Sequence, residues 1–179
     1  MKHTPLFCLL LLVTLLLLSQ CKKDDTDPLE QLPPATQTGA NTFGCLVNGQ
    51  AWTPQGNDGT ANYTVSYDRL YRDGTLVVAA YRISGGATSN QTVGINSDSL
   101  KTTGIFKLRT TGRHGAAFIN RQTSCQYYSQ DAITYCRGTL TITRLDLTAG
   151  VISGTFAFTL YKPGCDSIRV TNGRFDKKL

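Results

Sequence analysis

Alternation between apolar and polar residues along the last third of the chain constrains the fold more than any other sequence feature. In residues 151–160, the even-numbered residues from Phe156 to Leu160 are large and apolar, and the residues between them are small or polar. A period of two is typical of a strand that buries one face. Residues 138–144 repeat the pattern, and residues 168–176, with Val170 and Phe175, close the domain as a further strand. This part of the chain therefore predicts three strands joined by turns.

Shorter patterns of the same kind fill the chain from residue 42 onward, with no convincing helical period. Asn48-Gly49 predicts a two-residue hairpin turn, because both residues tolerate a positive φ. Residues 75–83 are so continuously apolar that they predict a central strand covered on both faces. The expected strands are residues 42–47, 50–53, 63–67, 75–83, 92–95, 105–109, 116–119, 138–144, 151–160 and 168–176. About ten short strands at this spacing predict an all-β fold, an antiparallel β-sandwich or a barrel-like fold.

The composition changes sharply before this region. Residues 22–41 are rich in Pro, Thr, Asp and Gln and hold few side chains suited to a core, and Pro33-Pro34 stiffens them. Such a segment is typical of an extended spacer. We therefore expect a signal peptide at residues 1–20, an acylated cysteine with a flexible tether at residues 21–41, and a single β-sandwich domain at residues 42–179.

The first twenty residues are typical of a secretory signal. A short polar start precedes an almost entirely apolar run at residues 6–18, which is shorter than the roughly 20 residues of a membrane-spanning helix. Leu18-Ser19-Gln20-Cys21 resembles the bacterial lipobox, which implies that Cys21 is lipidated after cleavage before it. Gln20 departs from the usual small residue and predicts slower processing. Ordinary cleavage that leaves Cys21 free, and a retained membrane helix, are the alternatives.

The four residues after the cysteine are charged. Lys22-Lys23-Asp24-Asp25 resembles the surface-export signal of Bacteroidota lipoproteins, a lysine followed by two acids. The resemblance implies a lipid-anchored protein of the bacterial outer membrane that is exposed at the cell surface. The periplasmic face of that membrane is the alternative location, and a merely solvated charged tether is the alternative role of these residues.

Four cysteines remain after the signal peptide and the anchor Cys21. An even number of cysteines in an exported chain predicts disulfides. Cys125 and Cys136 flank a polar stretch, so we expect a disulfide that closes this loop. Cys45 and Cys165 would then join the first strand to a late one. None of these cysteines has the close spacing of a zinc site, and the sequence predicts no metal.

The domain is basic. From residue 41 onward there are 15 Lys and Arg against eight Asp and no Glu, and no acid lies between Asp98 and Asp131. A basic patch attracts acidic glycans and phosphates. The alternative is that these basic residues simply face outward from the strands and keep the protein soluble. No nucleic-acid-binding module is recognisable, so we expect no nucleic acid as a partner. Aromatic rings beside arginines suggest a carbohydrate-binding face, with the candidate residues Tyr127, Tyr128, Tyr135, Lys107, Arg109 and Arg121.

Catalytic motifs are not found. His114 is the only histidine after the signal segment, and it lies in an expected loop. No Gly-x-Ser-x-Gly elbow, cofactor fingerprint or metal-ligand cluster occurs, and the aspartates fall mostly in turns. We therefore predict a protein without enzymatic activity or cofactor, and a hydrolase that uses His114 is the least favoured alternative. Ser99 and Ser167, each between Asp and an apolar residue, resemble sites of O-glycosylation in Bacteroidota.

Four segments carry a family resemblance: residues 43–52 (FGCLVNGQAW), 138–146 (GTLTITRLD), 152–158 (ISGTFAF) and 172–176 (NGRFD). They resemble an uncharacterised family of Bacteroidota lipoproteins with a lipobox, a short tether and a single β-rich domain of unknown function. The resemblance implies the cellular location and the fold, and it assigns no functional residue. We therefore expect a cell-envelope lipoprotein that acts in binding or envelope interaction. Its partners would be the membrane, through the anchor, and a glycan or another envelope protein, whereas the oligomeric state is not predicted.

Overall fold

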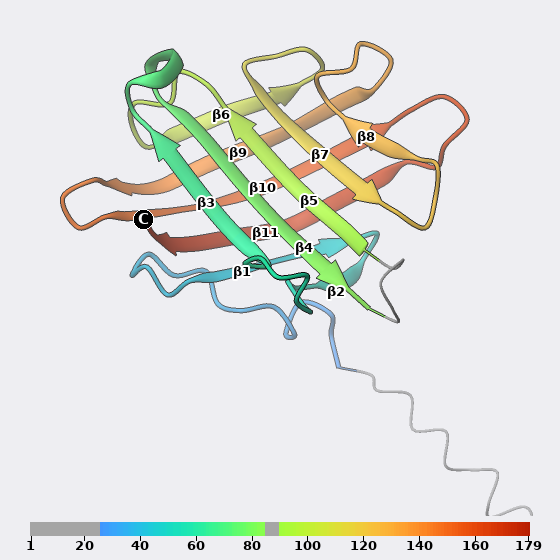
Figure 1. The fold of residues 1–179 in the computed structure, drawn as a ribbon, viewed down its shortest axis with the longest axis horizontal. Helices are drawn as coiled ribbons and strands as arrows, with labels where there is room; N and C mark the ends of the chain where they lie inside the picture. Colours follow the sequence, from blue (N-terminus) through green and yellow to red (C-terminus); the bar gives the residue numbers. More distant parts are fainter. Residues whose placement is uncertain (1–25, 85–89) are drawn as a thin grey trace, which may run out of the picture.

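Two antiparallel sheets face each other across one hydrophobic core (Figure 1). The structure is a computed structural model, and it describes residues 26–84 and 90–179. The strand order is β2-β1-β11-β10-β9-β6 in the six-stranded sheet and β3-β4-β5-β7-β8 in the five-stranded sheet. The prediction of an all-β antiparallel sandwich is confirmed.

The described residues form eleven strands and one 3-10 turn, η1, at Tyr71–Asp73. Ten of the strands match the sequence prediction, and β8 was missed because it is three residues long and lies in a polar stretch. The strands are β1 Thr42–Val47, β2 Gln50–Trp52, β3 Tyr63–Asp68, β4 Thr75–Ile83, β5 Asn90–Ser97, β6 Gly104–Arg109, β7 His114–Asn120, β8 Gln126–Tyr128, β9 Tyr135–Asp146, β10 Val151–Tyr161 and β11 Ile168–Lys178.

The core follows from the period-two pattern. Phe156, Phe158 and Leu160 all point from β10 into the space between the sheets and are buried. The Phe156 ring packs against Phe43 of β1 with the ring centroids 5.5 Å apart, and Phe43 lies at the same distance from Tyr63 of the opposite sheet. Each such side chain contributes about 1.5–3 kcal/mol by burial, so these contacts hold the two sheets together.

β4 departs from the prediction. Leu76, Val78 and Ala80 enter the core, but the outward-facing Val77 is 42% exposed. The prediction that this strand is covered on both faces is wrong. Its continuous apolar run arises because the outward positions also carry apolar residues, and these lie on the outer surface of the five-stranded sheet.

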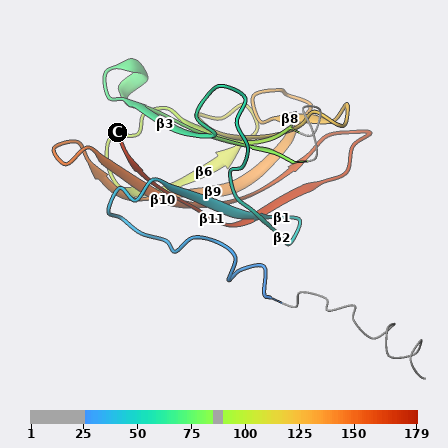
Figure 2. The ribbon, with the colours of Figure 1, turned by 60° about the horizontal axis from the view of Figure 1, so that its bottom comes forward.

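The segment before β1 also differs from the prediction of a flexible tether. Residues 26–41 lie along the outer side of the six-stranded sheet, on the side away from the five-stranded sheet (Figure 2). Leu32 is buried, and a side chain at Gly44 of β1 would meet the Pro33 ring, since an added Cβ would lie 2.7 Å from Pro33 Cδ. Part of the expected spacer is therefore a packed element of the domain.

Asp176 of β11 holds this segment in place. Its carboxylate is almost fully buried and accepts hydrogen bonds from the Thr36 hydroxyl at 2.6 Å and the Ser153 hydroxyl at 2.7 Å. The backbone N–H groups of three consecutive residues also donate to it, at 2.9, 2.8 and 3.0 Å, from Thr38, Gly39 and Ala40. We call residues 33–40 the docked segment.

The disulfide pairing differs from the prediction as well. Cys125 and Cys165 form a disulfide, with their Cα atoms 5.9 Å apart, and Cys45 and Cys136 are buried free thiols. The predicted pairs Cys125–Cys136 and Cys45–Cys165 are wrong. The observed bond joins the loop before β8 to the loop between β10 and β11, so it ties one sheet to the other.

Several sequence predictions lie outside the described residues. These are the apolar signal segment, the lipidation site Cys21 and the charged residues 22–25. In the part of the chain that is described, no helix has the length and apolar character needed to cross a membrane.

Candidate functional site

The outward side chains of the six-stranded sheet form rows, because its strands pair in register. Arg109 of β6 lies opposite Arg137 of β9, Arg137 lies opposite Thr159 of β10, and Thr159 lies opposite Arg169 of β11. Neighbouring strands are about 4.8 Å apart. This row therefore places three arginines and a threonine in a line across four strands.

A pair of tyrosines lies directly beside the arginine row. Tyr135 of β9 pairs with Tyr161 of β10, two residues along each strand from Arg137 and Thr159. The two tyrosines are 50% and 47% exposed. Two aromatic rings thus stand next to guanidinium groups on one accessible surface.

A second row lies on the other side of the arginine row. Lys107 of β6 is opposite Thr139 of β9, and Thr139 is opposite Ala157 of β10. Together the two rows and the tyrosine pair form what we call the binding face, whose residues are Tyr135, Tyr161, Arg109, Arg137, Thr159, Arg169, Lys107, Thr139 and Ala157.

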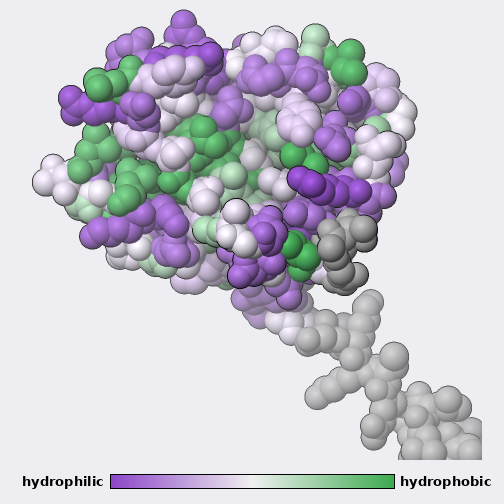
Figure 3. All heavy atoms as spheres, in the orientation of Figure 1, coloured by the Kyte–Doolittle hydropathy of each residue, from purple (hydrophilic) through white to green (hydrophobic). Residues whose placement is uncertain are grey.

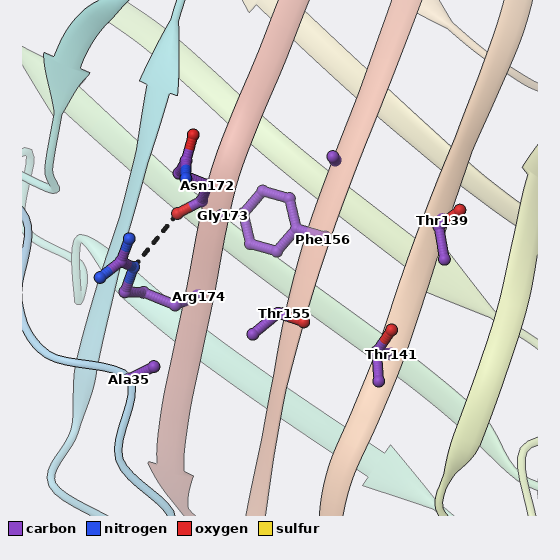
Figure 4. A pocket seen from close by; sticks show the side chains of 9 residues that line it. Ala35, Thr139, Thr141, Thr155, Phe156, Asn172, Gly173 and Arg174 are labelled. Atoms are coloured by element: carbon purple, nitrogen blue, oxygen red, sulfur yellow. Dashed lines mark hydrogen bonds between the residues drawn. The ribbon is translucent and has the colours of Figure 1, made fainter. Parts of the chain in front are cut away.

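A depression of about 440 Å³ opens at the edge of the binding face, over β9, β10 and β11 (Figure 4). Threonine hydroxyls from Thr139, Thr141 and Thr155 line it. Its floor includes the Phe156 ring, which occupies the space that a side chain at position 173 would need: a Cβ on Gly173 would lie 2.3 Å from that ring. The depression therefore presents threonine hydroxyl groups above a floor that the buried Phe156 ring closes from the core side.

Arg174 borders this depression and forms no ion pair with a carboxylate of the described residues. Its guanidinium donates to the carbonyl oxygens of Asn172 at 3.1 Å and of Pro33 at 3.2 Å. Both acceptors are neutral, so the positive charge of Arg174 adds to that of the binding face.

In residues 26–84 and 90–179, no ion pair includes a residue of the binding face. The ion pairs in these residues are Arg72–Asp98, Lys101–Asp73 and Arg144–Asp146. Like charges directly opposite each other across two strands are destabilising. Arg109 and Arg137 stand in that relation, so an anion bound between them would relieve the repulsion.

The structure brings together only half of the predicted ligand face. Tyr135, Lys107 and Arg109 belong to the binding face. Tyr127 points into the core and is 2% exposed, and its hydroxyl donates to the Asp166 carbonyl oxygen at 2.5 Å. Tyr128 lies on the outer surface of the five-stranded sheet, and Arg121 follows β7 in a turn. The grouping of Tyr127, Tyr128 and Arg121 with the other three is therefore wrong.

Sequence reasoning missed Tyr161, Arg137, Arg169 and Arg174. The alternation in residues 138–144 and 151–160 already indicated which side chains point outward. The missing information was the register, since only the pairing of β6, β9, β10 and β11 places Arg109 beside Arg137 and Tyr135 beside Tyr161.

His114 lies at the start of β7 and packs inward. Its Nδ1 is 2.7 Å from the Ser97 hydroxyl, and its ring packs against Phe106 with the centroids 5.1 Å apart. Burial lowers the pKa of His114, and nearby Arg113 lowers it further. Ser97 has no exposed surface, so its hydroxyl cannot reach a substrate in this conformation.

The free cysteines are also enclosed. Burial raises the pKa of Cys45 to about 12 and that of Cys136 to about 11, so both stay protonated near neutral pH. A thiol is a poor nucleophile and metal ligand. Residues 26–84 and 90–179 contain no cluster of three or more His, Cys, Asp or Glu side chains suited to a metal ion.

Comparison with known proteins gives one match. The family model of a domain of unknown function, DUF6252, matches residues 55–177. Searches among curated proteins and among solved structures found no match. The matched range covers β3 to β10 and nearly all of β11, whereas β1, β2 and the docked segment precede it, although β1 pairs with β11 and supplies Phe43 to the core.

Proposed function

The chain belongs to the DUF6252 family of domains of unknown function, and we propose that it is a lipid-anchored, non-enzymatic module of the bacterial outer membrane that binds an acidic glycan. The observation that carries the proposal is the cross-strand arrangement of Arg109 and Arg137, beside the exposed tyrosine pair and without an ion-pair partner among the described residues. The ligand would lie across the strands of the six-stranded sheet.

The chemistry of the binding face suits a charged sugar polymer. Guanidinium groups bind carboxylate, sulfate or phosphate groups through two parallel hydrogen bonds. Tyrosine rings offer an apolar surface to a sugar ring and a hydroxyl at their edge. Thr159 adds a hydroxyl between Arg137 and Arg169, and Thr139 adds one beside Lys107. A neutral glycan would leave the arginines unpaired, so the face favours an acidic one.

The envelope location is supported by the sequence. Cys21 ends a lipobox-like segment, and the acids after Lys22 and Lys23 resemble a surface-export signal. The surface-exposed leaflet is the location we propose, with the periplasmic face as the alternative. Another envelope protein is the alternative partner for the binding face.

Replacement of Cys21 by alanine is expected to abolish lipidation and to release the protein from the membrane. The measurement is incorporation of radiolabelled palmitate into the wild-type and Cys21→Ala proteins, followed by fractionation of the cells. Protease treatment of intact cells distinguishes the two leaflets. Palmitate incorporation that persists in Cys21→Ala would remove the proposed anchor.

Removal of one arginine is expected to weaken acidic-glycan binding by at least about tenfold, since a hydrogen bond to a charged group contributes roughly 1.5–3 kcal/mol, and removal of one tyrosine ring should also weaken it. The variants are Arg137→Ala and Tyr161→Ala, and affinity is measured by calorimetry with polygalacturonate. Added salt should weaken binding by the wild type.

Tyr128→Ala is the matched control, because Tyr128 is 38% exposed on the other sheet. Its affinity should equal that of the wild type. Dextran serves as the neutral glycan, and equal binding of dextran and polygalacturonate would contradict the acidic-ligand proposal. A loss of affinity in Tyr128→Ala that matches the loss in Tyr161→Ala would place the ligand elsewhere.

A further inference from the structure

The docked segment limits how far the domain can stand from a membrane anchor. It is held on the six-stranded sheet by Asp176 and by two arginines that donate to its carbonyl oxygens, Arg174 to Pro33 and Arg144 to Gln37. Upstream of it, Leu32 is buried and the Gln31 side chain donates to the Thr26 carbonyl oxygen at 3.4 Å. Residues 26–32 thus form a compact turn, and the chain is packed on the domain from Leu32 onward.

The remaining length of chain is short. Four residues lie between Cys21 and Thr26, and at full extension the chain from one to the other spans about 17 Å. β9 alone has twelve residues and is about 40 Å long. A domain anchored at Cys21 therefore lies close to the membrane, with the side that carries the N-terminal segment nearest to it.

The binding face is on that side. The docked segment lies on the outer surface of the six-stranded sheet (Figure 2), and the outward residues of β6, β9, β10 and β11 belong to the same surface. Ala35 of the docked segment even lines the depression beside the binding face. The short connection thus presents the basic rows toward the membrane.

The opposite surface has a different chemistry. Outward positions on β4, β5 and β7 carry uncharged residues, among them Val77, Ala79, Gly94 and Ala117. Figure 3 views this side and shows a hydrophobic central area with hydrophilic residues around it. Anionic membranes attract lysines and arginines near their surface, so electrostatics favours the six-stranded side.

We infer that the binding face lies against the membrane that carries the protein, and that its ligand is the anionic sugar-phosphate headgroup of a glycolipid in that membrane. The inference rests on the proposed lipid anchor and names the source of the proposed acidic glycan. The anchor supplies proximity, the docked segment supplies orientation, and the arginine row supplies the contact with the headgroups.

A vesicle experiment without the anchor tests the ligand. The mature chain, residues 21–179 with Cys21→Ala, is sedimented with phosphatidylcholine vesicles that do or do not contain lipopolysaccharide. Binding is expected only with lipopolysaccharide, and Arg109→Glu with Arg137→Glu should weaken it by at least about tenfold, since each basic residue near an anionic surface contributes about fivefold. Polygalacturonate binding by the same protein is measured in parallel. Binding to polygalacturonate without binding to these vesicles would overturn this inference and leave the proposed function intact, whereas no binding to either would overturn both.

A second measurement tests the orientation in the lipidated protein. Ile105→Cys, at the edge of the six-stranded side, and Ser66→Cys, on the outer surface of the five-stranded sheet, are each labelled with a fluorophore. The buried Cys45 and Cys136 and the disulfide leave no other exposed thiol in the described part of the chain. On lipopolysaccharide vesicles, acrylamide should quench the Ile105→Cys label severalfold less than in detergent, and the Ser66→Cys label equally in both. Equal accessibility of the two labels, or shielding of Ser66→Cys instead, would overturn the orientation.

Discussion

Replacing Asp176 with asparagine is expected to lower the free energy of unfolding by about 3 kcal/mol and to release the docked segment. The Asp176 Oδ1 accepts from the Gly39 N–H and the Ser153 hydroxyl, and its Oδ2 accepts from Thr36 and from two more backbone N–H groups. An asparagine supplies one acceptor oxygen and an NH₂ group. The NH₂ group would face the donor of Gly39, so a buried N–H would lose its partner.

The measurements are chemical denaturation and hydrogen exchange of the backbone amides of Thr38, Gly39 and Ala40. All three amides should exchange much faster in Asp176→Asn, because the carboxylate is their acceptor. Asp73→Asn is the matched control: Asp73 pairs with Lys101 on the surface, with 71% of its side chain exposed, and such a pair contributes about 0–1 kcal/mol. Unchanged protection of the three amides in Asp176→Asn would show that the segment is held by other contacts.

The same carboxylate predicts a dependence of stability on pH. Burial by itself would raise the pKa of Asp176, but hydrogen bonds from Thr36, Ser153 and the backbone of Ala40 and Gly39 hold that pKa well below its ordinary value. In the unfolded chain an aspartate titrates near pH 4. As the pH falls below about 4, the unfolded chain therefore takes up the proton first, and the stabilisation by Asp176 is progressively lost. The decrease in melting temperature between about pH 5 and pH 2 should be smaller in Asp176→Asn than in the wild type.

The strands were predictable because a strand that buries one face carries an apolar residue at every second position. β9 and β10 show this pattern over most of their length, so their inward and outward residues were assigned correctly. Thr75–Ile83 shows the limit of the pattern: a strand with apolar residues at outward positions gives the same signal as one that is covered on both faces. The periodicity of a strand can be read from neighbouring residues, whereas whether another element covers its outer face depends on the whole fold.

The binding face was only partly predictable, because pairing between strands is a long-range property. β6 and β9 adjoin in the sheet although β7 and β8 lie between them in the sequence. Nothing local to Lys107 or Arg109 indicates that Thr139 and Arg137 lie opposite them. Outward-facing charge was visible in the sequence, but its assembly with the tyrosine pair required the register.

The docked segment escaped prediction for a similar reason. Its composition is that of a spacer, and the buried Leu32 just before it is one of the few apolar residues in this part of the chain. What holds it is a carboxylate that follows it by about 140 residues and binds mainly backbone N–H groups. Every residue except proline has such a donor, so composition carries no sign of this docking.

Removal of the disulfide by Cys125→Ser with Cys165→Ser is expected to lower the free energy of unfolding by about 4 kcal/mol, the chain-entropy value for a closed loop of this length. The two cysteines are separated by 40 residues in the sequence, so the bond restricts a large part of the unfolded chain. Equilibrium unfolding in denaturant measures the effect. In the wild type a reducing agent should cause a similar loss, whereas the double variant should be insensitive to it.

A second double variant distinguishes the possible pairings. Cys45→Ala with Cys136→Ala removes the two buried thiols, which lie in the core at 0% and 4% exposure, so its baseline stability falls through lost packing. Its remaining stability should still depend on the reducing agent, because Cys125 and Cys165 keep their bond. Non-reducing peptide mapping should recover the segment around Cys125 linked to the segment around Cys165. Recovery of Cys125 linked to Cys136 would contradict the observed pairing.

Since only the observed bond ties the β7–β8 loop to the β10–β11 loop, its loss should also loosen the contact between Tyr127 and Asp166 at that end of the sandwich.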